Sequence, residues 1–208
     1  MTPDEFPEYY EPKNVHKIFG ISKDIHQRLD NGLGIANSSV FSFKVTQGLE
    51  QLDENRLNAE FLRIRRELRD HQKIYQKCSE KLSGMSKKDT ASLSMFRNDT
   101  DMRISLLKKQ SVFIVYQIAR MYNFQKVDLH GLTLQEAQEA IITVLDQIMR
   151  QITSNNLRKF NVEVITGKGL HSQGEAVLHP RIKQFLAEQG YLVKSSKDEG
   201  KLDVTIKA

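Results

Sequence analysis

Two stretches in the middle of the chain repeat hydrophobic residues at the spacing of packed helices. In the first, from Leu57 to Leu82, seam residues follow one another alternately four and three positions apart, and a second run from Ile104 to Met121 has the same spacing. An average repeat of about 3.5 residues is typical of a helix that packs along another helix. Because Gly84 and the polar segment after it interrupt the pattern, the sequence predicts an antiparallel helical hairpin. We interpret the polar seam residues His71 and Ser111 as setting its register or reaching its edge.

From about residue 124 the pattern changes to that of an α/β domain. Strand-like alternation and helix-like stripes take turns along the chain in the order β-α-β-α-β-β. This order predicts a small α/β sandwich, a sheet covered by two helices, preceded by the α-helical hairpin. The expected strands are 127–130, 160–165, 191–193 and 202–206. The first expected helix has an apolar stripe over 134–152, and Thr133 and Glu136 cap its start. The second has Pro180 in its first turn and ends at Gly190.

The N-terminal part has a different composition from the rest. Residues 1–50 contain three of the four prolines and one helix-like stretch, which opens at Ser22 and should stop near Asn31. We expect a mostly irregular tail or wrapping arm. The predicted organisation of the 208 residues is therefore 1–50 as this arm, 51–123 as the hairpin and 124–208 as the α/β domain.

Composition excludes several classes of protein. A single cysteine, Cys78, can form neither an intramolecular disulfide nor a zinc site made of several thiolates. No apolar run approaches the roughly 20 residues that a membrane-spanning helix needs, and the acidic start of the chain does not resemble a secretory signal. We therefore expect a protein of the cytoplasm, with the nucleus as the other choice, and no contact with a membrane.

The net charge of +5 is concentrated in the hairpin, because residues 51–123 carry 15 Lys and Arg but 9 Asp and Glu. Such a surface can attract a phosphate backbone by releasing counterions, although a run of charge is also typical of an ordinary solvated helix face. Both interpretations stay open for the cluster of Arg63, Arg65, Arg66 and Arg69.

Two motifs of the α/β domain carry candidate chemistry. Asp128 and His130 are two residues apart on an expected strand, so both side chains project from one face, and Gly131 lets the backbone turn away directly afterwards. An aspartate beside an imidazole favours its charged form and can fix its orientation, which suits proton transfer near neutral pH. A hydrogen-bonded strand end without catalysis is the alternative.

The second motif, Thr166-Gly167-Lys168-Gly169, follows the next expected strand. Its glycines permit close approach of a ligand, its amides can form an anion nest, and Lys168 adds a positive charge for a phosphate. A tight turn alone would explain the glycines equally well. His171 and Ser172 come next and can face the same site. His171 could contact phosphate or complete a metal site with Asp128 and His130, but three such ligands need not converge, and we expect no metal site.

The order and spacing of these motifs resemble a small MutS-related (Smr) domain. The resemblance rests on the run from Val127 to Leu132, on Glu136-Ala137 and on the run from Ile165 to Ser172. Gly174, Leu178, Pro180 and the closing run from Gly200 to Val204 fit the same pattern, so that it covers roughly 125–208. Residues 55–123 are similar, more loosely, to the helical extension that often precedes Smr domains in eukaryotic proteins.

The resemblance implies a fold like the C-terminal domain of a bacterial translation initiation factor, together with nucleic-acid binding and, in many members, endonuclease activity. Some eukaryotic relatives cleave mRNA on stalled ribosomes. Carried over by position, the motifs give Asp128, His130 and Lys168 as catalytic candidates, and Lys168 stands where relatives often have arginine. We expect nucleic acid to contact Gly131, Thr166, Gly167, Gly169, His171, Ser172 and the four arginines of the hairpin.

The resulting prediction is an RNA endonuclease, with mRNA on ribosomes as a candidate target. It would use acid–base chemistry without a metal or other cofactor, because RNA supplies its own nucleophile, the 2′-hydroxyl. One alternative is a module that binds RNA or a ribosome without cutting. A DNA-nicking enzyme is the second alternative, and it would need an activated water and a metal. The sequence leaves the oligomeric state open.

Overall fold

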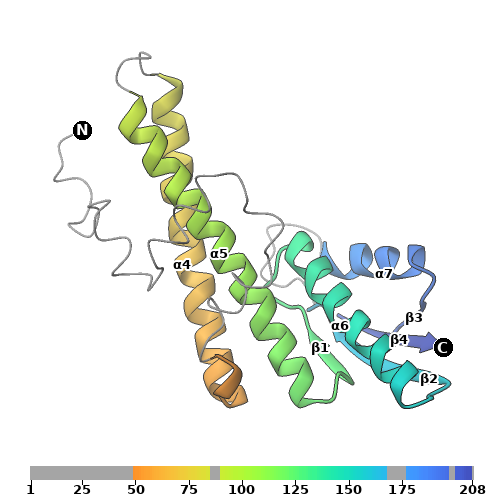
Figure 1. The fold of residues 1–208 in the computed structure, drawn as a ribbon. Coiled ribbons are helices and arrows are strands. Elements are labelled where there is room, and N and C mark those ends of the chain that lie inside the picture. Colours follow the sequence, from red (N-terminus) through yellow and green to blue (C-terminus); the bar gives the residue numbers. More distant parts are fainter. Residues whose placement is uncertain (1–48, 85–89, 168–176, 197–199, 208) are drawn as a thin grey trace. The chain divides into compact units, whose positions relative to one another are not determined.

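The computed structural model of the chain describes residues 49–84, 90–167, 177–196 and 200–207 (Figure 1). The helix expected from Ser22 and the arm expected over 1–50 therefore lie almost entirely outside the described residues. A short 3-10 helix, η3 (Leu49–Gln51), leads into the first long helix.

The helical hairpin is confirmed. Helix α4 (Glu54–Ser83) starts where the carboxylate of Asp53 accepts the amide of Arg56 at 2.8 Å, and it ends at Gly84 as the sequence indicated. Helix α5 (Ala91–Met121) packs along it in the antiparallel sense. It begins well before Ile104, where the apolar repeat starts, so hydrophobic periodicity located the contact between the helices and not the full length of α5.

The seam of the hairpin is a small hydrophobic core of its own. Ser111 is fully buried there, and its hydroxyl donates to the carbonyl of Leu107 in its own helix at 3.0 Å. His71 is half-buried and lies 3.9 Å from the carboxylate of Glu67. The buried members of this core are Leu57, Ile64, Leu68, Ile104, Leu107 and Ile114.

The C-terminal α/β domain has the predicted order of elements. Its four-stranded sheet runs β1-β2-β4-β3, with β1 and β2 parallel and the remaining pairs antiparallel. The predicted capping box is present, because Thr133 and Glu136 exchange both of its hydrogen bonds at the start of the first helix. In chain order the elements are β1 (Lys126–Asp128), α6 (Leu134–Ser154), β2 (Lys159–Ile165), α7 (Leu178–Glu188), β3 (Leu192–Ser195) and β4 (Lys201–Lys207).

Helix α5 belongs to two cores at once. Ile104, Leu107 and Ile114 face α4, whereas Val112 and Val115 pack into the core of the α/β domain together with α6 and the sheet. Figure 1 shows the end of α5 beside β1 and α6. The hairpin is therefore continuous with the domain that follows it.

One face of the sheet carries the core, and the opposite face carries polar residues. Val127 is fully buried in β1, so its neighbours Lys126 and Asp128 lie on the opposite face. This alternation places the end of β1, with Asp128, where a ligand can reach it. None of the described helices is long and apolar enough to cross a membrane.

Candidate active site

Asp128 and His130 form a hydrogen-bonded pair at the end of β1. The carboxylate oxygen Oδ1 of Asp128 accepts from ring nitrogen Nδ1 of His130 at 2.6 Å and from the backbone amide of the same residue at 3.0 Å. The strand ends at Asp128, so His130 lies in the turn that follows and not in the strand. The two bonds to one oxygen fix both the turn and the plane of the imidazole ring.

The environment of this pair suits proton transfer. The hydrogen bond to the carboxylate raises the pKa of His130 above its usual value, while partial burial acts in the opposite direction. Because Nδ1 donates to Asp128, Nε2 is the nitrogen that can take up or release a proton. The side chain of His130 is 65% exposed, so a substrate has access to it.

The turn after β2 lies directly against this pair. Gly167 has a φ of +77°, and a Cβ on it would lie 3.3 Å from Cβ of His130. β1 and β2 are parallel neighbours, so their carboxyl ends meet at one edge of the sheet. The structure thus brings Asp128, His130, Thr166 and Gly167 together.

Thr166 anchors the base of this loop. Its hydroxyl donates to the carbonyl of Gly200 at 2.9 Å, and the amides of Thr166 and Gly167 donate to the same oxygen at 2.8 and 3.2 Å. These two amides hold the loop to the turn before β4, so an anion nest would need amides further along the loop. The other expected residues of this motif, Lys168, Gly169, His171 and Ser172, lie outside the described residues.

His179 joins this network although its sequence position gave no reason to expect it. Its Nδ1 lies 3.0 Å from Oγ1 of Thr166. Because the hydroxyl proton of Thr166 already points to Gly200, the histidine is the donor in this contact. Burial, with the nearby charge of Lys183, lowers the pKa of His179. His179 lies in the first turn of α7, directly before Pro180, and no local pattern of the sequence links it to Thr166.

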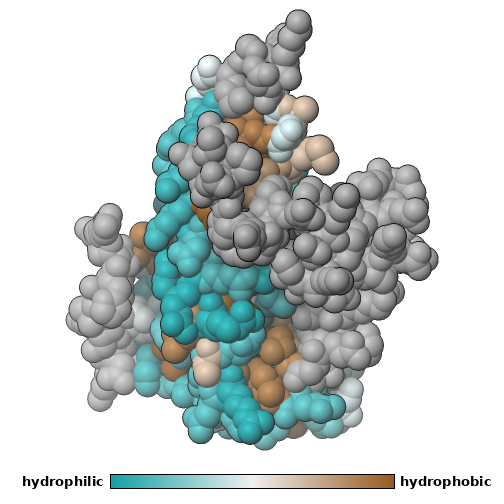
Figure 2. Space-filling view, turned by 90° about the vertical axis from the view of Figure 1, so that its left-hand side faces the viewer, coloured by the Kyte–Doolittle hydropathy of each residue, from teal (hydrophilic) through white to brown (hydrophobic). Residues whose placement is uncertain are grey.

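The four arginines of α4 do not form one surface. Arg63 bonds Glu60 and Glu67 on its own helix, whereas Arg65 points inward and donates to the buried carboxylate of Glu136 at 2.6 Å. Figure 2 views the side on which α4 lies and shows mostly hydrophilic residues there. Arg66 and Arg69 are exposed, and within the described part of the chain they form no hydrogen bond or ion pair.

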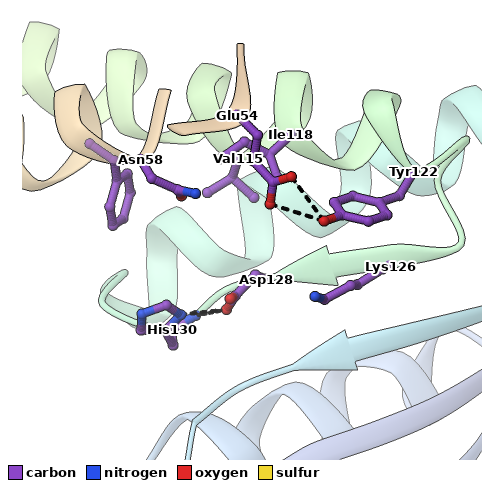
Figure 3. Close-up of a pocket in the computed structure, with 9 residues that line it drawn as sticks. Glu54, Asn58, Val115, Ile118, Tyr122, Lys126, Asp128 and His130 are labelled. Atoms are coloured by element: carbon purple, nitrogen blue, oxygen red, sulfur yellow. Dashed lines mark hydrogen bonds and ion pairs between the residues drawn. The ribbon is translucent and has the colours of Figure 1, made fainter. Parts of the chain in front are cut away.

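The hairpin also borders the Asp128–His130 pair. A Cβ on Gly131, whose φ is +79°, would lie 3.5 Å from the ring of Phe61 in α4. Between the hairpin and β1 is a cavity of about 80 Å³. Figure 3 shows Glu54, Asn58 and Tyr122 on its hairpin side, and Lys126, Asp128 and His130 along the opposite side. Nothing in the helical repeat indicated that α4 would reach this site.

In the described ranges, no three His, Cys, Asp or Glu side chains are grouped so that they could hold a metal ion. His171, the third ligand that such a site would need, is outside these ranges. The chemistry that the described residues support is proton transfer at Nε2 of His130, next to a loop that begins at Thr166.

Comparison with known families decides what this arrangement is. Residues 127–203 match the sequence profile of the Smr domain. This part of the chain is an Smr domain. The family is associated with nucleic-acid binding and nuclease activity. The Asp128–His130 pair and the Thr166-Gly167 turn both lie inside the matched range, and the two packed helices precede it.

Individual relatives match part of the chain. An uncharacterised protein of Treponema pallidum (strain Nichols) is 41% identical over 61 residues, which make up 29% of this chain and 27% of that protein. The chain thus covers about a quarter of the length of this relative. In a solution structure, the B3BP Smr domain is 29% identical, with 46% of this chain and 91% of that one covered and a TM-score of 0.37. The crystal structure of the human small-MutS related domain is 36% identical, with 38% and 98% covered and a TM-score of 0.31.

Proposed function

We propose that the protein is an RNA endonuclease whose Smr domain cleaves phosphodiester bonds by acid–base chemistry. The observation that carries the proposal is the 2.6 Å hydrogen bond from Nδ1 of His130 to Asp128, which orients the ring and leaves Nε2 to exchange protons with a substrate. Histidine is suited to this task because its pKa lies near neutral pH.

The proposed reaction uses the 2′-hydroxyl of RNA as the nucleophile. Nε2 of His130 takes the proton of this hydroxyl while its oxygen attacks the adjacent phosphorus. The bond from phosphorus to the 5′-oxygen then breaks, this oxygen takes up a proton from water, and the imidazolium of His130 releases its proton to solvent. The products are a 2′,3′-cyclic phosphate and a 5′-hydroxyl, and no redox partner or external nucleophile is consumed.

The remaining roles follow from charge. Asp128 stabilises the imidazolium that forms when His130 accepts the proton. We assign Lys168, in the loop that begins at Thr166, to the negative charge that develops on the phosphate oxygens. In the cell the substrate would be cytoplasmic RNA, with mRNA on ribosomes as a candidate.

Cleavage of an end-labelled single-stranded RNA tests the proposal. The wild-type protein should cut it in the presence of EDTA and leave 2′,3′-cyclic phosphate ends. His130→Ala should slow cutting by about 10²–10⁴-fold, the usual contribution of general acid–base catalysis. His71→Ala, which removes a histidine from the hairpin, is the matched control and should cut like the wild type. An equal rate for His130→Ala and the wild type would refute the assignment.

A binding module without nuclease activity is the second candidate. The exposed positions of Arg66 and Arg69 favour it, because unpaired arginines can neutralise phosphates. In such a module, Arg66→Glu with Arg69→Glu would remove salt-sensitive RNA binding, and Asp128→Asn would change nothing. A DNA-nicking enzyme would instead cut DNA and lose this activity with EDTA.

A further inference from the structure

The cavity between the hairpin and β1 combines an apolar floor with a polar rim. Phe61, Val115 and Ile118 supply the apolar side chains, while Asn58 and Glu54 supply polar groups from α4. Its volume of about 80 Å³ is far below the roughly 300–1,000 Å³ of pockets that enclose a whole small molecule. The cavity therefore fits one part of a larger ligand, such as a single planar ring.

The rim is suited to a neutral group that donates hydrogen bonds. The carboxylate of Glu54 accepts the hydroxyl of Tyr122 at 2.9 and 3.0 Å, and this contact holds it at the edge of the cavity. A carboxylate has about four acceptor positions, so Glu54 can accept further donors. Its negative charge disfavours a phosphate at this position, whereas the exposed carboxamide of Asn58 can both donate and accept.

The opposite rim belongs to the candidate active site. Asp128 and His130 line the same cavity, and the ammonium of Lys126 lies 5.1 Å from the centre of the Tyr122 ring. A ligand in the cavity is thus next to the imidazole that would act on a phosphate. The geometry matches a nucleotide whose base enters the cavity while its phosphate stays outside.

We propose that this cavity is a subsite for one nucleobase with an exocyclic amino group, adjacent to the phosphate on which His130 acts. The proposal rests on the proposed RNA-cleaving function and adds a substrate preference to it. Carboxylate and carboxamide side chains are the usual partners of the amino groups of cytosine and adenine. Uracil has a carbonyl oxygen in place of the amino group of cytosine, so only its single N3–H could donate, and the carbonyl oxygen would be repelled by the carboxylate of Glu54.

Binding of short oligonucleotides tests this subsite without relying on cleavage. The probes are octamers of 2′-O-methyl cytidine and of 2′-O-methyl uridine, which lack the attacking hydroxyl and so stay intact. The full chain should bind the cytidine octamer about tenfold more tightly, which is the scale of one contact to a base edge. Asn58→Ala and Glu54→Gln should each reduce this preference to less than about threefold.

Asn55→Ala is the matched control, because Asn55 is another exposed asparagine in the first turn of α4 and does not line the cavity. This variant should retain the wild-type preference. Thermal unfolding of each variant verifies that α4 still forms. Loss of the preference in Asn58→Ala with an unchanged unfolding temperature would establish the subsite.

Equal wild-type affinities for the two octamers would overturn the subsite even if the protein cuts RNA. An intact cytidine preference in both Asn58→Ala and Glu54→Gln would overturn it as well. Conversely, a preference that Asn58→Ala abolishes would establish the subsite even if the wild type cuts no RNA, and the nuclease proposal alone would then fail. If neither octamer binds at low salt, the subsite proposal fails, whereas the cleavage assay alone decides the nuclease proposal.

Discussion

A single carboxylate oxygen determines how His130 is presented. Oδ1 of Asp128 holds the ring and the backbone amide of His130 together, so ring orientation and turn geometry depend on each other. The two turns beside His130 depend on Gly131 and Gly167, since both have the positive φ that residues with a Cβ rarely adopt. Substitutions at Asp128 or in these two turns should therefore affect the chemistry of His130 more than the fold.

Asp128→Asn should lower the pKa of His130. The hydrogen bond to the carboxylate is the largest cause of the raised pKa, and an amide cannot stabilise the imidazolium in the same way. At pH values below the usual pKa of histidine, the variant should be less stable than the wild type. This difference in the free energy of unfolding disappears as the pH rises through the raised pKa of His130. A titration of the histidine ring protons by NMR measures the shift. His71, whose pKa is lowered mainly by burial, should not change.

Gly167→Ala should slow the reaction by displacing His130. The new methyl would lie 3.3 Å from Cβ of His130, in addition to the strain of a φ of +77°. Gly190→Ala is the control, because Gly190 has a φ of +85° and nothing within 4 Å of an added Cβ. Urea unfolding should show a loss of about 1–2 kcal/mol in Gly190→Ala, the cost of the left-handed conformation, and a somewhat larger loss in Gly167→Ala because of the added contact. A reaction rate lowered equally by both would contradict a specific effect on His130.

At the scale of elements, one ion pair joins α4 to the start of α6. The carboxylate of Glu136 accepts Arg65 at 2.6 Å and the amide of Thr133 at 2.7 Å, so it serves as a salt bridge and as part of the helix cap. Only 2% of the Glu136 side chain and 15% of the Arg65 side chain are exposed. The pair thus holds the hairpin against the start of α6, the helix that follows the turn with His130.

Arg65→Ala should therefore destabilise the protein by about 3–5 kcal/mol, because it leaves the charge of Glu136 buried without its partner. Arg63→Ala breaks a largely exposed pair and should cost less than about 1 kcal/mol. The free energy of unfolding in urea compares these two variants of the same helix. Equal losses would show that the inward pair does not hold the hairpin to the domain.

The sequence revealed the elements better than the contacts between them. The seam of the hairpin, the capping box at Thr133 and the neighbouring positions of Asp128 and His130 all follow from local spacing. The inward direction of Arg65 does not, because its partner Glu136 lies 71 residues away in the chain. His179 and Asn58 were missed for the same reason: each is placed beside the site by a contact that no periodic pattern records.

At the scale of the molecule, α5 makes residues 49–207 one folding unit, within the ranges that the structure describes. It contributes Ile114 to the seam with α4 and Val115, the next residue, to the core of the Smr domain. Adjacent residues of one rigid helix cannot separate from their cores independently. Loss of either core therefore weakens the other.

Leu107→Ala should destabilise the sheet although Leu107 is in the hairpin seam. Removal of this fully buried side chain should cost about 2–5 kcal/mol. Hydrogen exchange of backbone amides should then become faster by the same factor in α4 and in the central strand β4. Faster exchange in α4 alone would mean that the hairpin unfolds separately.

Among the described residues, the buried contacts between the hairpin and the Smr domain lie toward the end of the hairpin where α4 starts and α5 stops. Phe61 and Arg65 of α4 and Val112 and Val115 of α5 make the buried contacts, whereas Leu68 and Cys78 lie further along the hairpin. A fluorescent label or an inserted peptide at the other end, between Ser83 and Ala91, should therefore leave the Asp128–His130 pair undisturbed. Attachment of the protein to a surface through this end, between Ser83 and Ala91, should leave Asp128 and His130 accessible to substrate.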